Sequence, residues 1–380
     1  MEIKHTQLES MLFRAYKNKV ALFIAGTMGI GKSEMTMEVG KKIAKKVDRH
    51  FCDWNRTSDK EKLTLIEDRA KRESTFVFAD VRISGLDPSD LRGLPKLNGK
   101  DYVEWKPTIL FRLLSLDGVK AMLFFDEVNL APPSIQASAY QIILDKCIGE
   151  IALNPEIMIV GAGNRAEDKA NVFEMSAPLK NRFKHSTLRP PTYIEWIEWA
   201  MNNGIDDRII AFHHFKASDN AIMVDLKKLG QLKDNAFPTP RTWKFCSDSI
   251  KGFEDLDIIK IETCSAVGDG LGIEFTSFCK LKEKIDLDDI LANPSKIKDL
   301  ELDMKWNVIS GVSTKYKSNG KIMQSAFNLS LELEPDFGAS LLRMMKRQKE
   351  REFVTNAVKC KNWKQVLDRF GKYLLPSEGE

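Results

Sequence analysis

The sequence predicts an α/β protein in which helices flank a parallel sheet and a mainly helical region follows it. Two observations carry this prediction. Over roughly the first 190 residues, short apolar runs suited to strands buried on both faces alternate with segments of helical periodicity. Beyond about residue 190 the runs of strand length stop, while helical patterns continue. Parallel βαβ units in a three-layer core, followed by helices, are therefore expected.

Composition excludes several classes of protein. The chain has 380 residues, enough for two or three domains, and its 58 basic and 54 acidic side chains leave a net charge of only +4. No whole-molecule field therefore favours nucleic acid or an anionic membrane. The six cysteines lie far apart, which predicts reduced thiols rather than a zinc site or disulfides. The sequence shows neither a signal peptide nor an apolar run long enough to span a bilayer, so we expect a cytoplasmic protein.

Four apolar runs are expected to form the core strands. They are residues 20–25, 76–79, 121–125 and 157–160. After the first run, apolar residues recur every four positions from Met35 to Val47, which predicts an amphipathic helix. Its lysines at 41, 42, 45 and 46 lie off the apolar stripe and are interpreted as a solvated face.

A hairpin insertion is expected between the second and third strands. Within residues 82–107, the dipeptide Asn98-Gly99 separates two short apolar segments, and this pair of residues favours a tight β-turn. Such a hairpin is an addition to a regular α/β scaffold.

Helices are expected throughout the second half of the chain. The segments 192–204 and 206–215 have helical periodicity, and a further helix should begin near Arg241, just after two prolines. Charge runs at 280–284 and 346–352 predict exposed helix faces.

The strongest motif lies between the first strand and the first long helix. It consists of Gly26, Thr27, Met28, Gly29, Ile30, Gly31, Lys32 and Ser33. This is the G-x-x-x-x-G-K-[ST] pattern in its required strand–loop–helix setting, where glycines let backbone N–H groups surround phosphates. Lys32 is expected to bridge the β- and γ-phosphates of ATP, and Ser33 to bind Mg²⁺.

Acidic and amide side chains follow the third and fourth strands. Asp126 and Glu127 come directly after residues 121–125, and such a pair can hold Mg²⁺ and polarise the attacking water. Asn164 follows the fourth strand and is expected to place an amide near the γ-phosphate. Taken alone, either feature is an ordinary strand end or turn; their order after the phosphate loop gives them weight.

Six segments in this order resemble the AAA+ ATPases, and more narrowly their MoxR group in its bacterial and phage form. The segments are "GTMGIGKSE", "LDPSDLRGLP", "LFFDEVNLAPPSIQASAYQIILD", "GAGNR", "LKNRF" and "FPTPRTW", and the resemblance covers about residues 8 to 270. One departure is Met28, where members of the family commonly have proline.

The resemblance implies a role for each motif. Gly26–Ser33 match Walker A, Asp126 and Glu127 match Walker B, Asn164 matches sensor 1, Arg182 the arginine finger and Arg241 sensor 2. Residues 1–190 would form the nucleotide-binding domain, with a helix-2 insert hairpin at about 92–106 and a pre-sensor-1 insert at about 149–156. Residues 191–280 would form a helical lid. Residues 281–380 would be a mainly helical extension that matches no family element. The two inserts line the upper pore of such rings.

The implied function is Mg²⁺-dependent ATP hydrolysis at the subunit interfaces of a homo-oligomeric ring, a hexamer in this family. The ring would remodel or activate a partner protein in a chaperone-like way, often one with a von Willebrand factor A domain; neither a membrane nor nucleic acid is expected as a partner. Two alternatives stay open. One is a DNA-directed AAA+ motor that uses basic helices at 41–46 and 343–351 as phosphate contacts. The other is a nucleotide-gated scaffold with little turnover, which the presence of both Asp126 and Glu127 disfavours.

Metal-only and catalytic-triad hydrolases find little support. His213 and His214 are adjacent rather than four residues apart, and no G-x-S-x-G pattern occurs. The two histidines are interpreted as surface or core residues of a helix.

Overall fold

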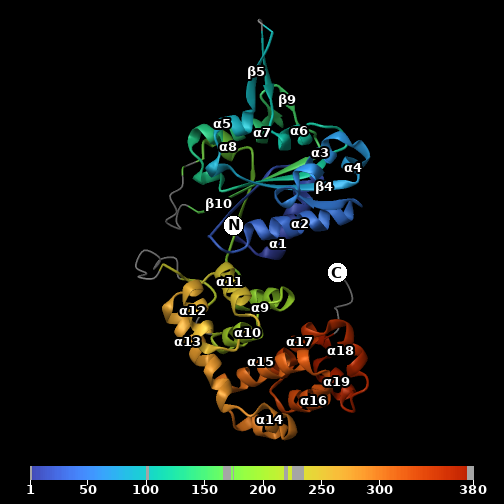
Figure 1. Ribbon diagram of the computed structural model, residues 1–380, viewed down its shortest axis with the longest axis vertical. Helices are drawn as coiled ribbons and strands as arrows, with labels where there is room; N and C mark the ends of the chain where they lie inside the picture. Colours follow the sequence, from blue (N-terminus) through green and yellow to red (C-terminus); the bar gives the residue numbers. More distant parts are fainter. Residues whose placement is uncertain are drawn as a thin grey trace. The chain divides into compact units, whose positions relative to one another are not determined.

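The computed structural model describes residues 2–99, 102–165, 173, 175–217, 221–224 and 235–374. The chain divides into two compact units, Met1–Pro190 and Pro191–Glu380, and each is described by itself (Figure 1).

The first unit is built on a seven-stranded sheet with the order β1-β11-β2-β10-β7-β4-β3. Its strands are β1 (Glu2–Ile3), β2 (Leu22–Gly26), β3 (His50–Asp53), β4 (Thr75–Arg82), β7 (Lys120–Asp126), β10 (Ile157–Gly163) and β11 (Lys184–Leu188). Every pairing in this sheet is parallel. The carboxyl ends of all seven strands therefore meet at one edge, where ligands of α/β sheets bind.

The four predicted core strands are β2, β4, β7 and β10, and the structure adds three that the sequence pattern did not reveal. β1 has two residues, and β3 and β11 contain polar residues instead of an apolar run. The predicted strand 76–79 is also longer, because β4 continues to Arg82.

Helices cover both faces of the sheet (Figure 1). α1 (His5–Asn18) and α2 (Lys32–Lys46) lie on one face. α2 packs closely there, because a Cβ added at Gly40 would lie 3.4 Å from the rings of Phe51 and Phe78. Side chains of α3 (Asp59–Glu67), α6 (Ile109–Leu114) and α7 (Pro133–Asp145) form the core against the other face. The remaining helices of this unit are α4 (Arg69–Glu73), α5 (Pro88–Arg92) and α8 (Ala177–Lys180).

Two hairpins are inserted in this scaffold. β5 (Leu94–Asn98) and β6 (Tyr102–Lys106) form the antiparallel hairpin predicted around Asn98-Gly99, and Gly99 has the positive φ of 76° that such turns use. β8 (Cys147–Ile148) and β9 (Ile151–Ala152) form the second, smaller hairpin.

The second unit is helical. It contains α9 (Tyr193–Asn202), α10 (Asp207–Phe215), α11 (Pro240–Ile250), α12 (Leu256–Val267), α13 (Asp269–Lys280), α14 (Leu287–Ala292), α15 (Leu302–Ser318), α16 (Met323–Glu332), α17 (Pro335–Gln348), α18 (Glu350–Ala357) and α19 (Trp363–Leu374). The first three correspond to the helices predicted near 192–204, 206–215 and 241. One hydrophobic core runs from Trp196 to Leu374, so residues 191–280 and the C-terminal region share it.

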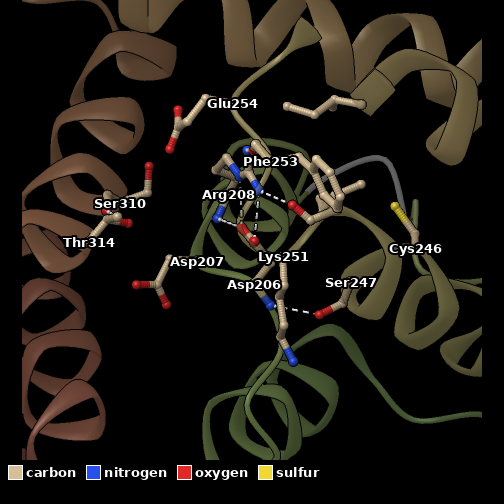
Figure 2. A network of polar contacts seen from close by, with 12 residues as sticks. Asp206, Asp207, Arg208, Cys246, Ser247, Lys251, Phe253, Glu254, Ser310 and Thr314 are labelled. Atoms are coloured by element: carbon tan, nitrogen blue, oxygen red, sulfur yellow. Dashed lines mark hydrogen bonds and ion pairs between the residues drawn. The ribbon is translucent and has the colours of Figure 1, made fainter. Parts of the chain in front are cut away.

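A polar network fixes the start of α10 (Figure 2). Arg208 Nε donates a hydrogen bond of 2.9 Å to Oδ1 of Asp206, and Nη2 donates one of 2.9 Å to Oδ2. The same guanidinium donates to the carbonyls of Phe253 and Ile250 at 2.7 and 2.8 Å. Because these carbonyls lie at and after the end of α11, one arginine ties that end to the start of α10.

A buried ion pair joins α17 to α10. Arg347 pairs with the carboxylate of Asp207, which is only 5% exposed, and donates to the carbonyl of Ile205 at 2.8 Å. Gln348 donates to the same carboxylate at 2.7 Å, and Lys346 donates to the carbonyl of Leu374 at 2.8 Å. The prediction that 346–352 form an exposed face is therefore wrong for this end of α17, because a buried carboxylate needs these partners.

His213 and His214 of α10 are core residues. The ring of His213 lies between those of Trp196 and Trp243, at centroid distances of 4.5 and 4.4 Å, and His214 stacks on Trp306 at 4.1 Å. Burial lowers the pKa of each histidine to about 3. Both rings are therefore neutral parts of an aromatic core rather than acid–base groups.

The predicted fold class is confirmed: a three-layer α/β core with a parallel sheet precedes a helical region. None of the described helices combines the length and the apolar character needed to cross a bilayer.

Candidate phosphate-binding site

The loop Gly26–Ser33 connects the carboxyl end of β2 to the first turn of α2. Gly29 and Gly31 have positive φ angles of 73° and 88°, a region that favours glycine. At Gly26 an added Cβ would lie 2.9 Å from the Leu188 carbonyl oxygen, so only glycine fits there. Gly31 directly precedes α2, whose first N–H groups have no partners within the helix. Such an end attracts anions.

The Lys32 ammonium lies over the loop itself. It donates to the carbonyl oxygens of Gly26 at 2.7 Å and Thr27 at 3.0 Å. It also donates, at 3.3 Å, to Oδ1 of Asn164, the residue that follows β10. Two of the predicted residues, Lys32 and Asn164, are thus brought together from neighbouring strands.

Ser33 and Asp126 also meet. The Ser33 hydroxyl donates to Oδ2 of Asp126 at 2.9 Å, and the Glu127 N–H donates to Oδ1 at 2.9 Å. A hydroxyl and a carboxylate are oxygen ligands of the kind that Mg²⁺ prefers. No group of three or more His, Cys, Asp or Glu side chains in the described part of the chain could hold a metal. Ser33 and Asp126 supply two oxygen ligands, and a Mg²⁺ ion held here would take its other ligands from phosphates and water.

Glu127 has a strained backbone. Its φ of 58° and ψ of 35° lie in the left-handed region, which is uncommon for a residue other than glycine. Its Oε2 accepts a hydrogen bond of 2.7 Å from the hydroxyl of Ser84, in the turn after β4. Ser84 was not predicted from the sequence, because a serine just after a strand gives no signal until the fold places it beside Glu127.

Asn129 holds Asn164 in place. Its Nδ2 donates to the Asn164 carbonyl at 2.6 Å, and its Oδ1 accepts from the Asn164 N–H at 3.1 Å. A Cβ at Gly163 would lie 2.3 Å from that Oδ1, so this contact requires the glycine before Asn164. Sequence reasoning missed Asn129, although its position two residues after Glu127 is a usable signal.

The N-terminal segment also contacts the loop. Arg165 donates to the hydroxyl of Thr27 at 2.9 Å and to the carboxylate of Glu2 at 3.1 Å. A ring nitrogen of His5 lies 2.8 Å from the Ile30 carbonyl oxygen. None of these contacts was predicted from the sequence.

Asp80 is a further carboxylate near the site that sequence reasoning passed over. It lies on β4, beside β7, which ends in Asp126. Burial, together with the negative charge of Asp126, raises the pKa of Asp80 to about 6. Its Oδ1 is buried and has no hydrogen-bond partner in the described part of the chain.

Arg182 lies away from the loop of its own chain. It follows α8 and precedes β11, which pairs with β2 from Lys184 opposite Leu22 to Leu188 opposite Gly26. The phosphate loop starts at the other end of this pairing, which is four residues or roughly 13 Å long. The Arg182 side chain is exposed, with no hydrogen bond or ion pair to the described residues.

Arg241 belongs to the helical unit. It is the second residue of α11, whose opposite side is anchored by the buried Trp243, and Trp243 donates to the Ala221 carbonyl at 2.9 Å. The Arg241 side chain is exposed and makes no hydrogen bond or ion pair within the ranges that the structure describes.

No protein-family model matches the sequence, and no curated protein matches it. Among solved structures, NtrX from Brucella abortus in complex with ATP has 14% identity and a TM-score of 0.35, over 88% of this chain and 67% of that one. A point mutant of Thermotoga maritima RuvB has 16% identity and a TM-score of 0.31, over 78% and 81%. Thermotoga maritima RuvB, described as a Holliday junction branch migration motor, has 17% identity and a TM-score of 0.29, over 79% and 82%. Likeness at these values decides neither the fold nor the function, which rest on the geometry above.

Proposed function

We propose that this chain is an AAA+ ATPase that binds Mg·ATP at the loop Gly26–Ser33 and hydrolyses it. One observation carries the proposal. The Ser33–Asp126 and Lys32–Asn164 hydrogen bonds, at 2.9 and 3.3 Å, bring residues from the loop and from the ends of β7 and β10 to one place. This arrangement is the one needed to hold phosphates, a metal ion and an attacking water together.

Each residue has a distinct task in the proposed reaction. Lys32, which donates to the loop carbonyls, would bind the β- and γ-phosphates, and Ser33 and Asp126 would hold Mg²⁺. When bound, Mg²⁺ supplies positive charge that offsets the charge on the phosphates. Glu127, restrained by Ser84, orients and polarises the attacking water. Asn164, fixed through its backbone, places its amide beside the γ-phosphate.

The place of Arg182 supports a ring. An arginine before the amino end of β11 is separated from a phosphate at the carboxyl end of the adjacent strand β2 by the length of their pairing, roughly 13 Å. Because it is exposed and has no partner among the described residues, it is free to reach the γ-phosphate of a neighbouring subunit. We propose that the chain forms a homo-oligomeric ring, a hexamer by its resemblance to the family. By the same resemblance, Arg241 would act as the sensor 2 residue.

We further propose that ATP drives remodelling or activation of a partner protein, as in MoxR-type ATPases, for which partners with a von Willebrand factor A domain are the first candidates. A protein partner fits the β5–β6 hairpin, where Leu97 is 76% exposed and its cross-strand partner Val103 45%. DNA fits less well. Lys41 and Lys42 of α2 pair with glutamates, and Arg347 is used inside the helical unit.

The test is nucleotide binding and turnover by Lys32→Ala. The lysine contributes charge to bound phosphates and little to the core, so the variant should fold normally, lose measurable ATP binding and lose turnover. Calorimetry, a phosphate-release assay and circular dichroism measure the three quantities. A folded variant with wild-type turnover would exclude this loop as the ATP site.

A further inference from the structure

The face of the sheet beneath α2 carries acidic side chains at or near the carboxyl ends of three strands, which are β3, β4 and β7. Side chains alternate between the two faces along a strand, so Asp80 shares a face with Phe78, on which α2 packs. The register places Asp80 opposite Phe124 and Arg82 opposite Asp126. Asp80 and Asp126 are therefore diagonal neighbours on this face, on adjacent strands.

The hydrogen bonds of Asp80 hold its backbone in place but do not stabilise the negative charge of its carboxylate. The side chain of Asn55 accepts from the Asp80 N–H at 2.9 Å and donates to its carbonyl at 2.7 Å, which fixes the backbone. The carboxylate has no such support, since its Oδ1 is buried and no described residue donates to it. Asp80 is half-buried, and a carboxylate whose buried oxygen lacks a donor is unfavourable beside a second carboxylate unless a cation or donor completes the site.

Asp53 on β3 provides the contrast. It occupies the same face, one strand further out, since it pairs opposite Phe78. Its carboxylate accepts from the Asn55 N–H at 3.1 Å and lies 3.5 Å from Arg56. Two carboxylates on neighbouring strands thus differ: Asp53 has a backbone donor and an ion-pair partner, whereas Oδ1 of Asp80 has no donor among the described residues, although the positive charge of Arg82 partly offsets that of the carboxylate.

We propose that Asp80 is a positioning residue for the nucleotide-bound Mg²⁺, accepting a hydrogen bond from water on the metal while Asp126 and Ser33 hold the ion. This inference rests on the proposed ATPase function and goes beyond it, because it assigns a second carboxylate to the metal. Asp80 strengthens the attraction of the site for a divalent cation and repels a metal-free triphosphate. The charge of Asp80 should therefore raise the affinity for the nucleotide when the metal is present and lower it when the metal is absent.

The experiment compares binding of a non-hydrolysable ATP analogue with and without Mg²⁺. Full-length wild type, Asp80→Asn and Asp53→Asn are each titrated by calorimetry, in excess Mg²⁺ and in EDTA. For Asp80→Asn the tightening produced by Mg²⁺ should fall about tenfold, the size expected for one charge acting on a divalent ion across a partly screened site. Binding in EDTA should be unchanged or tighter. Asp53→Asn should keep the wild-type ratio, and Asp80→Glu, which retains the charge, should recover most of the Mg²⁺ effect.

Two results overturn the proposal. One is an unchanged Mg²⁺ ratio in Asp80→Asn. The other is a ratio that Asp80→Glu fails to restore, since charge is what the proposal requires; an equal loss of affinity with and without Mg²⁺, as a merely structural role would give, counts as an unchanged ratio. Failure of the ATPase proposal looks different: wild type itself would then bind the analogue in neither condition.

Discussion

Glu127 shows how a single residue combines strain and function. Its left-handed backbone costs on the order of 1–3 kcal/mol, and the surrounding structure has to maintain it. The Ser84 hydroxyl, at 2.7 Å, fixes the side chain in one orientation. Such outliers cluster at active sites, which fits the role proposed for this carboxylate.

Glu127→Gln should bind Mg·ATP with nearly wild-type affinity, because Lys32, Ser33 and Asp126 remain. Turnover should fall by about 10²–10⁴-fold, since the amide cannot accept a proton from the attacking water. Calorimetry and a phosphate-release assay measure the two effects. The control is Glu73→Gln, since Glu73 lies next to the start of β4, at the opposite edge of the sheet. Joint loss of binding and turnover in Glu127→Gln would assign Glu127 a structural role.

The residues of the site differ in how far sequence could reveal them. The loop motif and the acidic pair were predictable, because their chemistry requires fixed residues at fixed spacings after a strand. Ser84, Arg165 and Asp80 were not, since each acquires its role through a contact with a residue distant in sequence.

At the scale of elements, α10 is the most instructive helix. Its sequence placed two histidines side by side, and packing put both into an aromatic core where they stay neutral. Each has a pKa of about 3 in the fold, against an ordinary value of 6.5. Between these values the unfolded chain binds protons that the folded unit does not, so the free energy of unfolding falls as the pH is lowered.

His213→Phe should therefore make the helical unit less sensitive to acid. Each buried histidine raises the unfolding equilibrium constant by up to about tenfold per pH unit below about 6.5, and the variant removes one such contribution. Urea unfolding followed by tryptophan fluorescence at several pH values measures this slope. The signal reports mainly on this unit, which holds Trp196, Trp199, Trp243, Trp306 and Trp363. His50→Gln, at an exposed position of β3, is the control; equal slopes in wild type and His213→Phe would contradict the buried-histidine account.

At the scale of the whole molecule, the proposed activity depends on assembly. A subunit that lacks Arg182 retains its own phosphate loop, and one that lacks Lys32 retains its own arginine. The two defects are therefore complementary only if Arg182 acts across an interface.

Arg182→Ala should bind ATP but lose about 10³-fold in turnover, within the range known for arginine fingers. Co-assembled with Lys32→Ala, it should recover part of the activity, at interfaces where an intact arginine faces an intact loop. Native mass spectrometry establishes that mixed rings have formed, and phosphate release measures the recovery. Absence of recovery in mixed rings would mean that Arg182 acts within its own subunit or only supports the interface.

The sequence by itself determined the α/β class, the phosphate loop and the residues expected beside that loop, which are Asp126, Glu127 and Asn164. It could do so because apolar runs, glycine spacing and acidic strand ends are local consequences of burial and phosphate chemistry. Only the tertiary structure decided the rest: the polar strands β3 and β11, the burial of Arg347 against Asp207, the unpartnered carboxylate of Asp80, and the distance of Arg182 from its own loop. Each of these depends on which distant segments meet, and strand order and helix packing, rather than local pattern, decide that.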